Sequence, residues 1–158
     1  MTQQRVVVTA GAQGIGLAIT GAFVAAGAQV HICDINDDFL AAAKIKFPSV
    51  SQSRTDVSDE AQVDAMFAEL STRWGGLDVL VNNAGIAGPT AKVEDTDLTE
   101  WSQTIAVNLT GPFLCTRRAV PLLRRQVAVP SSTCRRLQGG SAFHCARRIP
   151  PPSTASLA

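Results

Sequence analysis

One stretch near the N-terminus decides the fold, Val6-Val7-Val8-Thr9-Ala10-Gly11-Ala12-Gln13-Gly14-Ile15-Gly16-Leu17-Ala18-Ile19. It runs from a β-branched strand through a glycine-rich turn into a helix. Such a turn brings main-chain N–H groups and a helix N-terminus to the carboxyl end of a strand, and its glycines let a pyrophosphate approach the main chain. The stretch therefore predicts a dinucleotide site, although a tight strand-to-helix connection without a ligand has the same pattern.

The residues that follow alternate between strand and helix patterns with short connections. Strands are predicted at 6–9, 29–33, 51–55 and 77–81, and helices at 14–26, 37–47 and 59–74. The first helix is expected to turn Ile15, Ala18, Ile19, Ala22 and Phe23 inward. Strict alternation favours a parallel sheet with right-handed crossovers. We therefore expect an α/β fold, a Rossmann-type doubly wound parallel sheet with strand order 3-2-1-4, truncated after the fourth strand and its following helix.

Asp34 ends the second predicted strand, 18 residues after Gly16. A carboxylate at this place can accept hydrogen bonds from the adenosine ribose hydroxyls and would repel a 2′-phosphate, so it favours NAD over NADP. In the alternative interpretation Asp34 only caps the next helix, a role that Asn36 or Asp37 could also fill.

Three later segments complete a recognisable set: Asp56-Val57, Asn83-Ala84-Gly85 and Val107-Asn108-Leu109. Together with the glycine turn they resemble the short-chain dehydrogenase/reductase family over residues 5 to about 125. Ala10 stands where the first glycine of the family's turn usually lies. The resemblance implies an NAD-dependent oxidoreductase that acts on a small-molecule alcohol or ketone and forms a homo-oligomer.

The resemblance also implies roles for particular residues. Asp56 and Val57 would flank the adenine ring, the Asn83 segment would line the cofactor, and Asn108 would be the active-site asparagine. The expected cofactor-binding residues are Thr9, Gly11, Gln13, Gly14, Ile15, Gly16, Asp34, Asp56, Val57, Asn83, Ala84 and Gly85.

The family's chemistry also requires a serine and a Tyr-x-x-x-Lys pair. The tyrosine passes a proton to or from the substrate oxygen while hydride moves between substrate and nicotinamide. The sequence contains no tyrosine, and its last lysine is Lys92, well before the place of the family's lysine. Asn108 is thus left without its partners, and we predict that the chain is inactive by the family mechanism.

Residues 127–158 have a different composition. From residue 101 onward every charged side chain is an arginine, and the segment contains Pro150-Pro151-Pro152 but no sustained hydrophobic period. We expect a partial NAD-binding domain at 1–126 and an irregular or disordered basic tail at 127–158. A basic tail can bind nucleic acid.

A shift of reading frame explains the composition of residues 127–158 without a nucleic-acid-binding function. Permitted codons from Gln126 onward, read one base earlier, encode G-G-G-T-I-V-N-L-S-S-A-A-G-R-L-G-F-P-L-R-S-P-Y-S-A-S-K. This resembles the family's next strand, its serine and its Tyr-x-x-x-Lys. We hypothesise a one-base deletion near the codon for Gln126, and therefore expect no nucleic-acid partner. The alternatives are an NAD-binding module without catalysis, an unstable product without activity and a basic-tailed interaction protein.

The remaining features exclude other classes. No run of about 18 apolar residues could span a membrane, and the first residues lead into strand sequence rather than a signal peptide, so we expect a cytoplasmic protein. Cys33, Cys115, Cys134 and Cys145 lack metal-ligand spacing with His31 or His144. We expect free thiols and no metal.

Overall fold

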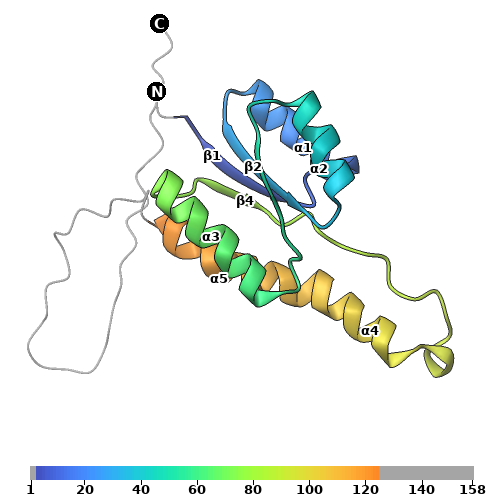
Figure 1. Cartoon of the computed structure of the whole chain (residues 1–158). Coiled ribbons are helices and arrows are strands. Elements are labelled where there is room, and N and C mark those ends of the chain that lie inside the picture. Colours follow the sequence, from blue (N-terminus) through green and yellow to red (C-terminus); the bar gives the residue numbers. More distant parts are fainter. Residues whose placement is uncertain (1–2, 125–158) are drawn as a thin grey trace, which may run out of the picture. The chain divides into compact units, whose positions relative to one another are not determined.

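The computed structural model describes residues 3–124, which form a four-stranded parallel sheet between helices (Figure 1). The strands are β1 (Arg5–Thr9), β2 (Gln29–Asp34), β3 (Ser51–Arg54) and β4 (Val79–Val81). Their order in space is β3-β2-β1-β4, as predicted. The central strand β1 pairs with β2 from Arg5 and Gln29 onward, and with β4 from Val6 and Val79 onward.

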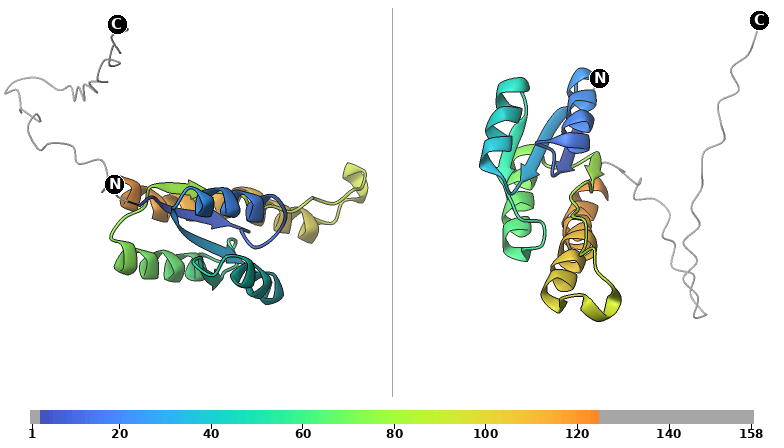
Figure 2. Two further views of the ribbon diagram at one scale, coloured as in Figure 1. Left: turned by 90° about the horizontal axis from the view of Figure 1, so that it is seen from above. Right: turned by 90° about the vertical axis from the view of Figure 1, so that its right-hand side faces the viewer.

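Helices cover both faces of the sheet, with α1 and α2 on one side and α3 and α5 on the other (Figure 1). Their bounds are α1 (Gly14–Ala25), α2 (Asp37–Lys46), α3 (Glu60–Trp74) and α5 (Gly111–Arg124). A short 3₁₀ helix (Val93–Asp95), α4 (Leu98–Ile105) and a π turn (Ala106–Thr110) precede α5. Figure 2 shows that α4 continues the line of α5 and extends beyond the sheet. This arrangement confirms the predicted doubly wound architecture.

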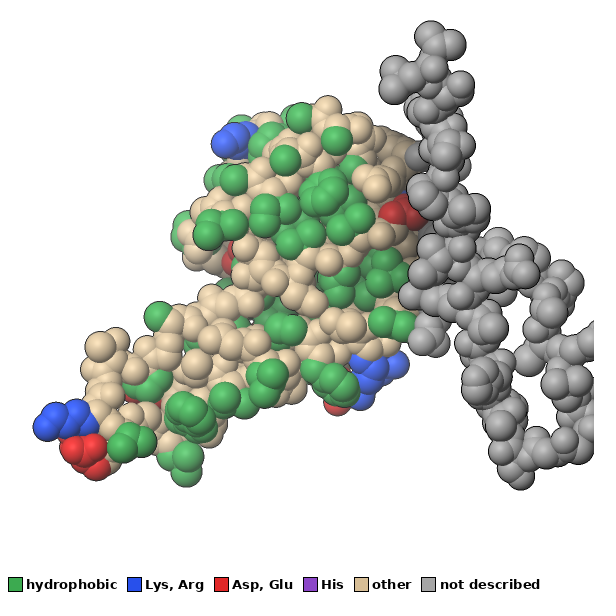
Figure 3. Space-filling model, turned by 180° about the vertical axis from the view of Figure 1, so that it is seen from behind, with side chains coloured by type: hydrophobic (Ala, Val, Ile, Leu, Met, Phe, Trp, Pro, Cys, Tyr) green, Lys and Arg blue, Asp and Glu red, His purple; other side chains and the backbone are tan. Residues whose placement is uncertain are grey.

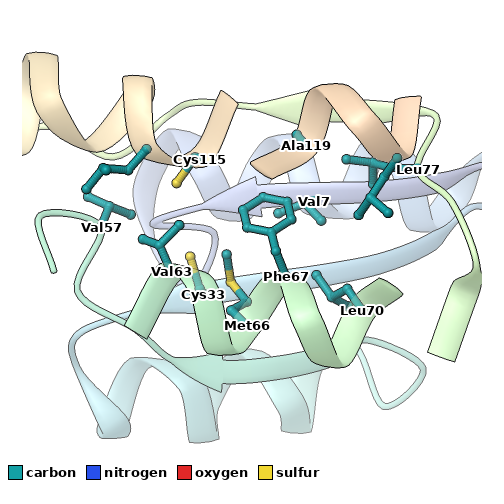
Figure 4. Close-up of a cluster of buried hydrophobic side chains, with 12 residues drawn as sticks. Val7, Cys33, Val57, Val63, Met66, Phe67, Leu70, Leu77, Cys115 and Ala119 are labelled. Carbon is teal, nitrogen blue, oxygen red and sulfur yellow. The ribbon is translucent and has the colours of Figure 1, made fainter. Parts of the chain in front are cut away.

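The alternation of side chains along β1 divides the core into two clusters. Val7 packs on the α3 and α5 side (Figure 4), and Val6 and Val8 pack on the α1 and α2 side; all three are fully buried. A strand that is buried on both faces reads as a continuous apolar run in the sequence. The predicted inward positions of α3 are buried as well: Val63, Met66, Phe67 and Leu70.

Five of the ten large hydrophobic residues that are exposed in the described chain lie along α4, the π turn and the start of α5. They are Leu98, Trp101, Ile105, Leu109 and Phe113. Figure 3 shows hydrophobic side chains spread along this arm. The spacing of three or four residues places them on one side of the helical segment.

The inward face predicted for α1 is wrong in part. Ile15 is 76% exposed, and Ala18 and Ala22 are exposed as well, whereas Gly16 and Thr20 are buried. The Thr20 hydroxyl donates to the main-chain oxygen of Gly11 over 3.2 Å. The glycine turn therefore sets the rotation of α1, which buries the small residues Gly16 and Thr20, while the predicted positions Ile19 and Phe23 pack partly buried against the core.

β4 begins two residues later than predicted. The Leu77 N–H donates to the main-chain oxygen of Leu122 in α5 over 3.3 Å, so this residue lies outside the strand ladder although it is buried. The predicted boundary at residue 126, the tail at 127–158 and the residues Cys134, His144 and Cys145 lie outside the described residues. Within residues 3–124, no helix has the length and apolar character needed to cross a membrane.

Candidate functional site

The predicted site residues lie at one edge of the sheet. Because all four strands are parallel, the glycine turn after β1, Asp34 at the end of β2 and the segments after β3 and β4 meet at the carboxyl edge. In open parallel sheets, ligands bind in the crevice outside this edge.

The glycines of the turn are required for different reasons. A Cβ on Gly11 would lie 2.7 Å from Cγ2 of Ile32, and a Cβ on Gly16 would lie 2.0 Å from the main-chain oxygen of Ala10. Gly14 has no neighbouring atom within 4 Å of its ideal Cβ, but its φ is +52°. Gly11 and Gly16 thus let the turn pack on the protein itself, whereas Gly14 leaves open space above the turn.

The N-terminus of α1 is free to bind an anion. Helices α2, α3 and α4 begin after Asn36, Asp59 and Asp97, and each of these side chains accepts main-chain N–H groups of its helix. The corresponding residue before α1, Gln13, makes no such bond. Leu17 is the first residue of α1 whose N–H finds a main-chain acceptor, at 3.0 Å from the Gln13 oxygen. The preceding N–H groups of the helix point outward with the positive end of the helix dipole.

Asp34 supplies a buried carboxylate beside this turn. It is 7% exposed; its Oδ1 accepts the Asn36 N–H over 3.2 Å, and its Oδ2 has no hydrogen-bond partner. The cap of α2 is Asn36, which accepts the Phe39 N–H over 3.1 Å. The capping role that the sequence left open for Asp34 therefore belongs to Asn36. An orphaned carboxylate oxygen is costly unless a ligand or water donates to it.

Asp56 and Val57 offer different groups at the end of β3. The Asp56 Oδ1 accepts the N–H and hydroxyl of Ser58 over 2.9 and 2.7 Å. The Val57 side chain is 6% exposed and packs in the core with Val63 (Figure 4). Val57 can therefore contact a ligand only through its main chain.

Thr9 and Asn83 brace the turn. The Thr9 hydroxyl donates to the Val81 oxygen over 3.3 Å and accepts the N–H groups of Asn83 and Ala84 over 2.9 and 3.0 Å. The Asn83 amide donates to the main-chain oxygens of Thr9 and Ala10, both at 3.0 Å. Thr9 is 1% exposed, so its hydroxyl supports the turn from within. These bonds fix the end of β4 against the glycine turn.

Asn108 lies in the π turn, and its side chain is committed to one residue. Its Oδ1 accepts the Ile86 N–H, and its Nδ2 donates to the Ile86 oxygen, both over 2.8 Å. The pair ties the loop after Gly85 to the helical segment. A cavity of about 500 Å³ adjoins this loop. It is lined by Ile86, Ala87, Gly88, Pro89, Thr99, Glu100, Gln103 and Thr104.

The two buried cysteine side chains nearby are neutral thiols. Burial raises the pKa of Cys33 to about 12 and that of Cys115 to about 11. Both are free thiols, as predicted, and neither is activated as a nucleophile. In the part of the chain that the structure describes, no three His, Cys, Asp or Glu side chains form a metal-binding group.

Several supporting contacts were not predicted from the sequence. Thr20 fixes α1 against Gly11, Ile86 holds Asn108, and the Gln62 side chain accepts the Asp56 N–H over 3.0 Å. Only Ala10 carried a signal, because it occupies the family's glycine position. Its φ is +47°, the only positive φ of a non-glycine residue among residues 3–124.

Comparisons with known proteins agree with this geometry. The short chain dehydrogenase family matches residues 4–129. The short chain dehydrogenase/reductase dpchG of Colletotrichum higginsianum is 41% identical over 117 residues, which cover 72% of this chain and 44% of that protein. The L-fucose dehydrogenase of Bos taurus is 38% identical over 120 residues, covering 76% and 44%. The 2-dehydro-3-deoxy-L-rhamnonate dehydrogenase (NAD(+)) of a Sphingomonas species is 34% identical over 117 residues, covering 74% and 47%.

Solved structures show the same likeness. A short-chain dehydrogenase from Streptomyces avermitilis superimposes with a TM-score of 0.74 at 30% identity, covering 80% of this chain and 46% of that one. Levodione reductase gives a TM-score of 0.74 at 32% identity, covering 80% and 51%. The chain spans about half the length of these relatives. The family match over most of the sequence and the shared sheet lead to one conclusion: this chain belongs to the short-chain dehydrogenase family.

Proposed function

We propose that this chain forms the NAD-binding part of a short-chain dehydrogenase and does not catalyse the family's oxidation of an alcohol or reduction of a ketone. The observation that carries the proposal is the orphaned, buried Oδ2 of Asp34 beside the uncapped N-terminus of α1. The Asp34 carboxylate can accept a hydrogen bond from a hydroxyl group of an adenosine ribose. The free N–H groups at the start of α1 can donate hydrogen bonds to a pyrophosphate.

In the proposed complex the first N–H groups of α1, at Gly14, Ile15 and Gly16, bind the pyrophosphate. Gly14 leaves the approach open. Asp34 accepts the ribose hydroxyls and repels a 2′-phosphate, which selects NAD over NADP. The name of the Sphingomonas relative, a dehydrogenase of the NAD(+) type, supports this choice.

The remaining predicted contacts belong to the same proposal. Asp56 and the Val57 main chain bind the adenine, with Gln13, Gly11, Ala84 and Gly85 along the cofactor. Thr9 and Asn83 position the turn through the bonds described above. Bound NAD would supply a hydride acceptor.

The sequence lacks the groups that the family's mechanism requires for proton transfer. The sequence has no tyrosine and no lysine after Lys92, and the Asn108 amide is occupied by Ile86. We propose that a shifted reading frame after Gln126 removed the serine and the Tyr-x-x-x-Lys. The alternative is an unstable product that does not bind NAD. The exposed hydrophobic residues along α4 favour this alternative, because they leave apolar area in contact with solvent.

The small-molecule substrate, the cytoplasmic location and the homo-oligomer implied by the family are further proposals. The exposed stripe of Leu98, Trp101, Ile105, Leu109 and Phe113 supports self-association through α4 and α5. Its substitution with polar residues should reduce any oligomer seen by analytical ultracentrifugation.

Calorimetric titration with NAD and NADP tests the binding proposal. We expect the full chain to bind NAD more tightly than NADP, and Asp34→Ser to abolish this preference. Asp38→Ser is the matched control, because Asp38 is an exposed acid in the first turn of α2. Failure to bind NAD, or equal affinity for NADP in the unmutated chain, would contradict the proposal.

The coding DNA around the codon for Gln126 tests the second part. Codons that do not permit the alternative reading would refute the shifted frame. A restored frame should confer NAD-dependent alcohol oxidation that the present chain lacks. Ordinary turnover by the present chain would show that the missing tyrosine is not required.

A further inference from the structure

A second cavity lies at the other edge of the sheet. Its volume is about 290 Å³, and it is lined by Gln29, Val30, Ser49, Ser51, Arg73 and Trp74. These residues stand at the start of β2, around the start of β3 and at the end of α3. Because the strands are parallel, this amino edge is opposite the edge that carries the glycine turn. Occupation of this cavity therefore does not compete with a nucleotide, and the inference below does not rest on the proposed function.

Arg73 is the positive charge of this cavity, and no acidic side chain of the described residues pairs with it. Other arginines of the described chain pair with carboxylates: Arg5 with Asp78, Arg54 with Asp37, Arg117 with Glu60 and Arg118 with Asp64. Among residues 3–124, no ion pair or hydrogen bond engages the Arg73 guanidinium. Glu69, one turn earlier in α3, forms no ion pair with it either. The guanidinium is therefore available to an anion from solution.

Hydroxyl groups and an aromatic ring complete the lining. The Ser51 hydroxyl lies 3.0 Å from Nδ1 of the buried His31 and 3.3 Å from the Val30 oxygen. The Trp74 ring meets the His31 ring edge to face at 6.3 Å. Burial lowers the pKa of His31 to about 4, and the positive charge of Arg73 contributes to this shift. The positive charge of Arg73 therefore acts on the His31 ring, which contacts Ser51 and Trp74 in the wall of the cavity.

We propose that this cavity binds a small molecule that carries an oxyanion, either a carboxylate or a phosphate. The anion pairs with Arg73, the Ser49 hydroxyl donates a hydrogen bond to it, and Trp74 forms the apolar wall. The Ser51 hydroxyl, which donates to the Val30 oxygen, contributes to the polar wall of the cavity. The volume is at the lower end of the range for small-molecule sites, which suits a metabolite-sized ligand rather than a cofactor.

Two tryptophans make the test direct. Trp74 lines the cavity, and Trp101 lies in the exposed arm of α4. We would titrate the full chain at pH 7 with inorganic phosphate and, separately, with acetate, and follow the two indole N–H signals and the His31 ring signals by NMR. We expect the Trp74 and His31 signals to shift with saturation in the millimolar range, while the Trp101 signal stays constant. The anion that saturates at lower concentration identifies the preferred class.

Three variants identify the binding group. Arg73→Gln should weaken binding at least about tenfold, because a charge-assisted contact is lost. Glu69→Gln should strengthen it, since a nearby negative charge is removed. Arg54→Gln is the control, because Arg54 lies at the end of β3 and pairs with Asp37. Absence of saturation, or equal shifts in Arg73→Gln and the unmutated chain, would overturn the proposal; unchanged circular dichroism would verify that each variant is folded.

Discussion

The Asn83 side chain binds the main chain of Thr9, with Nδ2 donating to the Thr9 oxygen over 3.0 Å, and the Thr9 hydroxyl accepts the Asn83 N–H over 2.9 Å. The two residues are 74 positions apart in the chain. This reciprocal contact joins the end of the outer strand β4 to the turn after the central strand β1. The turn is thus held by β4 as well as by its own glycines.

Asn83→Ala should lower the free energy of unfolding by about 1 to 3 kcal/mol, because two main-chain oxygens at the turn lose their donor. NAD affinity should fall with it, since the turn would lose its fixed position. Asn82→Ala is the matched control: Asn82 is exposed, and within residues 3–124 its side chain donates only to the Thr116 hydroxyl, over 3.1 Å. Urea unfolding and calorimetry measure both effects. Equal losses in the two variants would contradict the bracing role.

Ala10→Gly should stabilise the protein. Ala10 has a φ of +47°, a conformation that an L-residue adopts at a cost and that glycine adopts freely. We expect the free energy of unfolding to rise by about 0.5 to 1 kcal/mol, because the relief of strain exceeds the greater chain entropy of glycine when unfolded. Ala12→Gly is the control, because Ala12 is buried and its φ is not positive. This variant should be less stable, and a loss of stability in Ala10→Gly would refute the strain.

Gly14 and Gly16, the two glycines of the turn that lie within α1, should respond differently to substitution by alanine. Gly16→Ala places a Cβ 2.0 Å from the Ala10 oxygen, so the backbone must move, at a cost of about 2 kcal/mol or more. Gly14→Ala meets open space and carries only the strain of its positive φ, about 1 kcal/mol. Thermal and urea unfolding of both variants measure the difference. A larger loss in Gly14→Ala would mean that the packing around Gly16 adapts.

Stability should depend on pH through His31. Its pKa is about 4 in the folded chain, lowered by burial and Arg73, and 6.5 is its ordinary value. Above pH 6.5 the His31 ring is neutral in both the folded and the unfolded chain, so protonation of His31 does not lower the free energy of unfolding. As the pH falls from 6.5 to 4 the unfolded state takes up a proton that the folded state refuses, so the free energy of unfolding falls by up to about 3 kcal/mol.

Urea unfolding between pH 4 and pH 8 tests this dependence. His31→Gln should remove the slope between pH 6.5 and about pH 5, whatever its effect on stability at pH 7. Below about pH 5 Asp78 contributes a slope of its own, because its hydrogen bond with Arg5 lowers its pKa in the folded chain and its carboxyl takes up a proton first in the unfolded chain. An unchanged slope in the variant would assign the dependence to other groups.

The parts of the fold that sequence predicts well are those in which hydrophobic pattern and burial coincide. Val6 to Val8 lie in a central strand, and α3 buries Val63, Met66, Phe67 and Leu70, which recur at helical spacing. The rotation of α1 was not predictable in this way. There the Thr20 bond to Gly11 and the close approach at Gly16 bury two small residues beside the partly buried Ile19 and Phe23, and a hydrophobic pattern records only the large residues.

The candidate site shows a similar division. Asp34, Asp56 and Asn83 follow strands, and strand ends meet at one edge of a parallel sheet, so their neighbourhood follows from the alternation of strands and helices. The roles of Asp56, Asn83 and Asn108 rest on the resemblance to the family and stay predictions. Their hydrogen-bond partners were not predictable. Asn108 binds the main chain of Ile86, and any residue could supply that N–H and oxygen. The Asn36 cap was one of several that the sequence allowed.

The order of the sheet has a consequence for how the molecule opens. β1 is enclosed by strands on both sides and its valines are fully buried, whereas β4 has three residues, all partly exposed, and is the outer strand of the described sheet. Amide hydrogens of short outer strands exchange through local opening long before those of the centre. When β4 detaches, Asn83 leaves with it. The glycine turn, although it follows the buried strand β1, therefore loses its contacts with Asn83 whenever the edge strand β4 opens.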